Sequence, residues 1–153
     1  MVLALVVWLG GVIFLSFVEA PTAFAVIPTR HMAGTVVGRS LVTLHWMGIV
    51  SGLVFLLASL LYSRLTSGTA RPLEARNLLM VLMLVLTLVS QFGITPRMMA
   101  LRNSMVLIDS VPLNDPARVE FDALHVWSVR LEGGVLLLAL VVTYLTAQQL
   151  AGR

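Results

Sequence analysis

The sequence predicts an all-α fold, a four-helix transmembrane bundle with both termini on the same side of the membrane. Hydrophobic residues make up 59% of the 153 residues and charged residues only 11%, whereas soluble domains carry about 25% charged residues. Four separate stretches are apolar over the roughly 20 residues that a helix needs to cross a bilayer. An even number of crossings returns the chain to its starting side. This composition excludes a soluble enzyme, a disordered chain and a coiled coil.

We expect a single membrane domain, residues 1–153, with spans at about residues 2–27, 41–62, 78–99 and 121–147. The first span is interrupted late, at Glu19 and Pro21. Glycine and proline residues between the spans are typical of turns. We call the side that holds both termini the terminal side and the opposite one the loop side. The bilayer itself is therefore the first predicted partner.

All ten basic residues are Arg, and they form neither a patch nor a stripe, which excludes a nucleic-acid binder. On the terminal side we count Arg64, Arg71, Arg76 and Arg153. On the loop side we count Arg30, Arg39, Arg97, Arg102 and Arg118. Because the two sides are nearly balanced, the excess of positive charge that marks cytoplasmic loops favours neither orientation.

Polar side chains inside the spans gather toward the loop side, while the terminal-side half is expected to be almost purely Leu, Val, Met and Ala. Groups of this kind are costly in a membrane and need a partner or a purpose. They form either a buried ion-pair network or a polar cavity that opens to the loop side. The residues concerned are Glu19, His45, Gln91, Arg97, His125, Arg130 and Glu132.

Matched depth suggests how the charges pair. Glu19 and Arg130 both lie about 12 Å from the loop-side end of their spans, at 1.5 Å per helical residue, and we predict that they form an ion pair. Arg97 with Glu132 would make a second pair. The predicted structural polar cluster comprises Glu19, Arg97, Asp122, Arg130 and Glu132.

The fourth span carries charge on two faces. At 100° per residue, Arg130 projects about 160° away from Glu132. A helix of this kind is either central in the bundle or covered by another protein. We therefore expect neighbouring membrane subunits along the fourth span.

Two histidines are candidate cofactor ligands. His45 and His125 lie at similar depths on two spans, where facing imidazoles could hold a haem iron or one imidazole could ligate a chlorophyll. Alternatively each ring makes a local hydrogen bond, for which Asp122 is a ready partner of His125. We predict no metal site and no catalytic residues, because the chain has no Cys, no nucleophile elbow and no zinc-binding HExxH motif. His31 is expected to lie in a loop.

Small residues mark close helix contacts. Gly48 and Gly52 form a GxxxG pattern in the second span. Packing within the chain and dimerisation explain this pattern equally well.

Four blocks of sequence resemble the transmembrane protein 205-like family of four-span proteins, a bacterial domain of unknown function. The blocks are residues 14–24, residues 38–39, residues 95–97 with 100–102, and residues 121–133. The chain departs from the family pattern at Glu132, near which members usually carry Asn, and at His45-Trp46, where they carry aromatic residues. The resemblance implies a four-helix membrane bundle. It also implies a distant similarity to copper-resistance membrane proteins and four-span haem-binding oxidases.

Together these features lead us to expect a non-enzymatic, multi-pass protein of the bacterial inner membrane. Its expected role is an accessory or scaffold subunit of a larger complex, for example in respiratory or photosynthetic electron transfer. One alternative is a haem- or chlorophyll-binding redox or pigment protein that uses His45 or His125. A further alternative is a small transporter with a polar site at Glu19 and Arg130.

Overall fold

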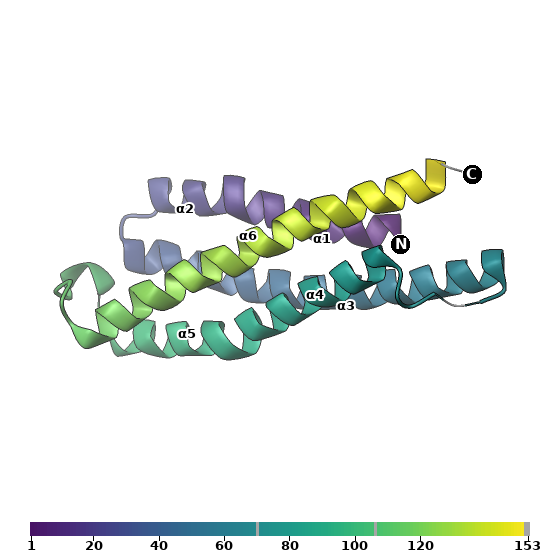
Figure 1. Cartoon of the computed structure of the whole chain (residues 1–153). Coiled ribbons are helices and arrows are strands. Elements are labelled where there is room, and N and C mark those ends of the chain that lie inside the picture. Colours follow the sequence, from purple (N-terminus) through teal and green to yellow (C-terminus); the bar gives the residue numbers. More distant parts are fainter. Residues whose placement is uncertain (70, 106, 152–153) are drawn as a thin grey trace.

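The long helices of the computed structural model lie side by side in one bundle, with both termini at the same end (Figure 1). The structure describes residues 1–69, 71–105 and 107–151, and no strand occurs among them. Four helical segments are long and apolar enough to cross a membrane, which confirms the predicted fold class. The elements are α1 Val2–Phe14, η1 Leu15–Glu19, α2 Ala20–Val26, α3 Arg30–Ser67, α4 Ala75–Val89, η2 Ser90–Ile94, α5 Thr95–Ser104, η3 Ile108–Ser110 and α6 Pro116–Ala151.

The helices extend beyond the predicted spans, chiefly on the loop side. α3 begins at Arg30, because the Thr29 side chain accepts the Met32 backbone N–H at 3.2 Å and caps the helix. It ends at Gly68, whose φ of 71° is the left-handed conformation that glycine adopts readily. The predicted connection 28–40 is therefore mostly helix, and His31 lies in the first turn of α3 rather than in a loop. Arg153 falls outside the described residues.

The bundle is arranged as a ring, so that two pairs of helices face each other only across its diagonals. α1 packs on α3, α3 on α4, α4 on α6, and α6 on α1. Toward the loop side α6 continues along α5, whereas α2 stays against α3. α2 and α6 therefore diverge at that end of the bundle (Figure 1).

The main hydrophobic core lies in the terminal-side and central parts of the bundle, and Trp8 is its largest side chain. Trp8 is 2% exposed and rests on Gly48 and Gly52 of α3. A Cβ atom at Gly48 would lie 2.5 Å from the indole nitrogen, and one at Gly52 would lie 2.9 Å from a ring carbon. The GxxxG pattern therefore packs within the chain. A second, smaller core of Met105, Ile108 and Phe121 closes the loop-side end.

The terminal-side half of the bundle also contains buried polar groups, mostly just beyond the predicted spans. Asn77 accepts a hydrogen bond from the Ser59 hydroxyl at 2.7 Å and donates to the Arg71 carbonyl at 3.0 Å. Arg76 is buried and pairs with Glu74 at 2.9 Å. α4 begins at Ala75, earlier than the predicted span, and this start carries Arg76 and Asn77 into the bundle.

The contact between Trp8 and Gly48 predicts a strong effect of a single methyl group. Gly48→Ala should lower the free energy of unfolding by about 1–3 kcal/mol, because overpacking displaces the indole. Gly10→Ala is the matched control, since a Cβ at Gly10 meets no atom within 4 Å in the described structure. Thermal unfolding in detergent measures both variants. Equal stability of the two would contradict the packing described here.

Candidate functional site

A buried histidine joins three helical segments at the depth where the polar residues gather. His45 on α3 is 1% exposed. Its Nδ1 lies 2.8 Å from Oε1 of Gln91 in η2, and its Nε2 lies 2.6 Å from Oε1 of Glu132 on α6. Because α3 and α6 face each other across a diagonal of the ring, the contact with Glu132 spans the bundle.

The two contacts tie His45 to two other segments at once. Both imidazole nitrogens lie within hydrogen-bond distance of a side-chain oxygen, Nδ1 of Gln91 and Nε2 of Glu132. Which nitrogen carries the hydrogen depends on the tautomer of the ring. The Glu132 carboxyl group, which is 14% exposed, therefore has a polar partner at membrane depth.

Two π-helical turns shape this region, and each is followed closely by a proline. η1 precedes Pro21 and η2 precedes Pro96. Proline cannot donate a backbone hydrogen bond, and its ring clashes with the carbonyl four residues earlier. The wider turn accommodates this defect, and such turns are frequent at functional sites. Gln91 in η2 reaches His45, and residues 15–17 of η1 line the adjacent cavity.

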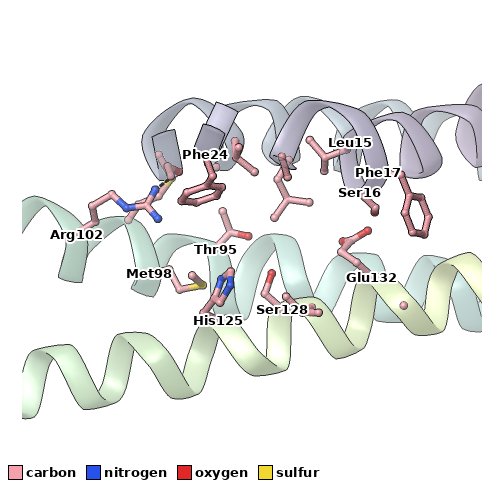
Figure 2. Close-up of a pocket in the computed structure, with 18 of the residues that line it drawn as sticks. Leu15, Ser16, Phe17, Phe24, Thr95, Met98, Arg102, His125, Ser128 and Glu132 are labelled. Atoms are coloured by element: carbon pink, nitrogen blue, oxygen red, sulfur yellow. Dashed lines mark hydrogen bonds between the residues drawn. The ribbon is translucent and has the colours of Figure 1, made fainter. Parts of the chain in front are cut away.

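This cavity, of about 420 Å³, lies between the diverging α2 and α6 and the loop-side parts of α3 and α5 (Figure 2). Its wall is mainly apolar. α3, α5 and α6 each contribute residues spaced by three or four positions, which is one helix face. From these helices the lining residues are Gly34, Val37, Gly38, Leu41, Thr95, Met98, Met99, Arg102, His125, Ser128, Val129, Glu132, Gly133 and Leu136.

The two ends of the cavity carry opposite kinds of polar group. Glu132 lies at the inner end, and Arg102 lies at the loop-side mouth (Figure 2). The guanidinium of Arg102 donates to the Gly34 carbonyl and lies 5.1 Å from the Phe121 ring centre. No carboxylate of the described residues pairs with Arg102, and its Nε is buried without a hydrogen-bond partner.

Between these ends lie the side chains of Thr95, His125 and Ser128 (Figure 2). Thr95 is 6% exposed, and its hydroxyl finds no hydrogen-bond partner among the described residues. That oxygen is itself buried, whereas Arg102, His125 and Ser128 are further polar residues that line the cavity. The cavity can therefore both enclose an apolar group and hydrogen-bond a polar one.

The predicted ion pairs were wrong. Within the described structure, Glu19 and Arg130 make no ion pair. Glu19 borders a separate, shallower groove between α1 and α3. Arg130 is exposed on the outer side of α6, with its guanidinium 5.2 Å from the Trp127 ring centre. The transporter site expected at this pair does not form.

The other expected contacts also differ from those observed. Arg97 pairs with Glu120 at 2.7 Å instead of Glu132. Asp122 pairs with Arg118 at 3.0 Å, and His125 stacks on Phe121 with ring centres 6.5 Å apart. The five residues of the predicted cluster therefore do not meet. Of these five, Glu132 alone joins the buried histidine.

The histidines do not form the facing pair that haem ligation would need. Both ring nitrogens of His45 are already hydrogen-bonded, so iron or magnesium could bind His45 only after one of these bonds broke. His125 is exposed at the cavity wall. The described histidines therefore do not supply the two axial ligands of one haem iron.

Sequence reasoning did not single out Arg102, Thr95 or Ser128 as site residues. A signal was present: Thr95, Met98, Met99 and Arg102 have the spacing of one helix face, as do Gly34, Val37, Gly38 and Leu41. Arg102 was counted only as a loop-side surface charge, because α5 was expected to end near Met99. The three residues do lie within the blocks that carry the family resemblance.

Fold and site together define a four-span integral membrane protein with a cavity near its loop side. Residues 3–106 match the family described as a domain of unknown function, DUF4149. The match covers more than half of the chain, which belongs to this family. It includes α1 to α5, while α6 with Ser128 and Glu132 lies beyond it. The comparisons found no match among curated proteins and none among solved structures.

The bridge from His45 to Glu132 predicts coupled losses of stability. His45→Leu and Glu132→Leu should each lower the free energy of unfolding by about 3–5 kcal/mol, because each leaves a buried polar partner unpaired. The double variant should recover about 0.5–3 kcal/mol of the summed loss. Unfolding in detergent provides the measurement.

Glu19→Gln is the matched control, because Glu19 is also a carboxylate at membrane depth but makes no ion pair among the described residues. Its stability should change by less than about 0.5 kcal/mol. Purely additive losses for His45 and Glu132 would mean that the bridge does not exist.

Proposed function

We propose that this chain is a non-enzymatic membrane protein that binds a small lipid-soluble molecule in the cavity between α2 and α6. The observation that carries the proposal is the cavity itself, with its apolar wall and the polar side chains of Ser128 and Arg102 on it. Its volume of about 420 Å³ falls in the range of about 300–1,000 Å³ that is typical of ligand sites. Such sites combine apolar walls with a few polar groups that orient the ligand.

The geometry supports binding rather than chemistry. Glu132 is the carboxylate on the cavity wall, and it is already hydrogen-bonded to His45. His125 faces the cavity, but its ring stacks on Phe121, and no nucleophile–base pair is recorded there among the described residues. A site with these groups can hold and orient a molecule that enters sideways from the bilayer.

The membrane and family context forms part of the same proposal. The blocks at the first and fourth spans support a transmembrane protein 205-like protein, and the family resemblance supports a location in the bacterial inner membrane. Because the cavity lies between helices that can span a membrane, we expect its ligand to enter from the lipid phase.

The proposal is tested directly by filling the cavity with a larger side chain and measuring how well the protein still binds a lipid. The probe is 1-palmitoylglycerol, an uncharged single-chain lipid, added to the purified protein and counted by native mass spectrometry. Gly133→Phe should weaken its binding at least about ten-fold, equivalent to about 1.4 kcal/mol. The reason is that Gly133 lines the cavity and its Cβ direction is open, so the phenyl group fits without a backbone clash.

Gly10→Phe is the control, since it adds the same group at an open, exposed position of α1 that does not line the cavity. It should bind the lipid as the unmodified chain does. If the unmodified chain binds no 1-palmitoylglycerol, or if both variants bind it equally, the proposal fails.

An accessory or scaffold subunit, plausibly of an electron-transfer complex, is the second candidate. The case for a covering subunit along α6 is weaker than the sequence suggested, because Glu132 points into the bundle and, of the two opposed charges, Arg130 alone projects outward. Trp127 beside it is a residue type enriched at membrane interfaces, so Arg130 can also extend toward lipid headgroups. The subunit role predicts a native particle larger than the 16.6 kDa chain in mild detergent, reduced in size by Arg130→Leu. A monomeric particle would exclude it.

A further inference from the structure

We infer that the cavity binds a single-chain anionic amphiphile, with its acidic headgroup at Arg102 and its chain directed toward Leu136. This inference rests on the proposed function and adds the chemical class of the ligand. It depends on three features of the cavity: an uncompensated cation at the mouth, a polar middle, and a wall that is mainly apolar.

The cation at the mouth is held in place and remains available. Arg102 donates one hydrogen bond to the Gly34 carbonyl and rests on the Phe121 ring. Gly34 makes this approach possible, because a Cβ there would lie 2.8 Å from Nη2 of Arg102. The guanidinium retains donors for an oxyanion, since an Arg side chain carries five N–H groups in a planar fork.

The nearby acidic groups do not neutralise Arg102. Glu120 pairs with Arg97, and Asp122 pairs with Arg118. Asp109 accepts the backbone N–H of Arg30 at 3.1 Å. A half-buried cation without a carboxylate partner attracts an anion from outside the chain.

The charge pattern also sets the direction of the ligand. An acidic group is attracted by Arg102 at the mouth, and Arg102 is the one Arg among the lining residues that the structure describes. The headgroup therefore stays near the loop-side surface of the membrane, where lipid headgroups lie. Ser128 lies between the two ends of the cavity (Figure 2), and its hydroxyl can donate to an ester carbonyl behind the headgroup.

The size of the cavity favours one chain. Along α6 it extends from His125 to Leu136, which is about 16 Å at 1.5 Å per residue. The volume of about 420 Å³ lies near the lower end of the range for ligand sites. A fatty acid and a lysophosphatidate share the required chemistry, an oxyanion at the end of one acyl chain.

The test compares three probes that share a 16-carbon acyl chain, by native mass spectrometry of the full chain: palmitate, 1-palmitoyl lysophosphatidate and uncharged 1-palmitoylglycerol. At least one acidic probe should bind about ten-fold tighter than 1-palmitoylglycerol. Arg102→Gln should abolish this preference. Arg97→Gln, which removes a charge from the same helix outside the cavity, should preserve it.

A second variant covers the possibility that Arg102→Gln does not fold. Gly34→Ala keeps the charge but displaces the guanidinium from its position, and it should reduce the preference for the acidic probe. Tight binding of lysophosphatidate alone identifies a phosphate headgroup as the source of the oxyanion. Tight binding of palmitate alone identifies a carboxylate, and tight binding of both acidic probes shows that either oxyanion is accepted. Each of these results supports the inference.

Two results would overturn the inference and separate it from the proposed function. Equal binding of all three probes, still weakened by Gly133→Phe, would refute the anionic ligand while leaving the cavity as a lipid site. An equal loss of preference in Arg97→Gln and Arg102→Gln would assign the effect to general surface charge. Binding of none of the probes would overturn both proposals.

Discussion

The hydrogen bonds of His45 are the constraint on which the rest of the structure depends. One imidazole connects α3 with η2 through Gln91, and connects α3 with α6 across the bundle diagonal through Glu132. Leaving either partner unpaired in this buried site would cost several kcal/mol. The bond to Glu132 also fixes the rotation of α6. With Glu132 turned inward, Arg130 must project outward beside Trp127, and Ser128 and Leu136 must face the cavity.

The cavity results from a change in packing along the bundle. On one side of His45, Trp8 fits against the bare backbone at Gly48 and Gly52, and α1 and α3 lie close together. On the loop side the chain passes through the π-helical turns before Pro21 and Pro96, and α2 diverges from α6. The separate core around Phe121 closes the far end. The space between the two cores remains unfilled by the protein's own side chains.

Sequence reasoning predicted the four spans because long apolar runs determine membrane crossing almost alone. It also predicted that the polar side chains Glu19, His45 and Glu132 lie toward the loop side, since depth follows from counting residues. It did not predict the partners, because depth gives no rotation about the helix axis. A π-helical turn adds one residue and shifts the phase by about 100°, so the direction of Glu19, at the end of η1, does not follow from counting residues. α6 has no such turn among its described residues, and there the opposed directions of Arg130 and Glu132 were predicted correctly.

Photo-cross-linking in native membranes tests the central claim most directly, namely that the space beside His45 and Glu132 is a lipid-binding site. A palmitate analogue with a diazirine on its chain is activated by light, and the labelled peptides are identified by mass spectrometry. The account predicts labels concentrated in residues 95–102 of α5 and 125–136 of α6, displaced by excess unlabelled palmitate. Labels spread evenly over the outer faces of all four helices, and insensitive to competition, would contradict it.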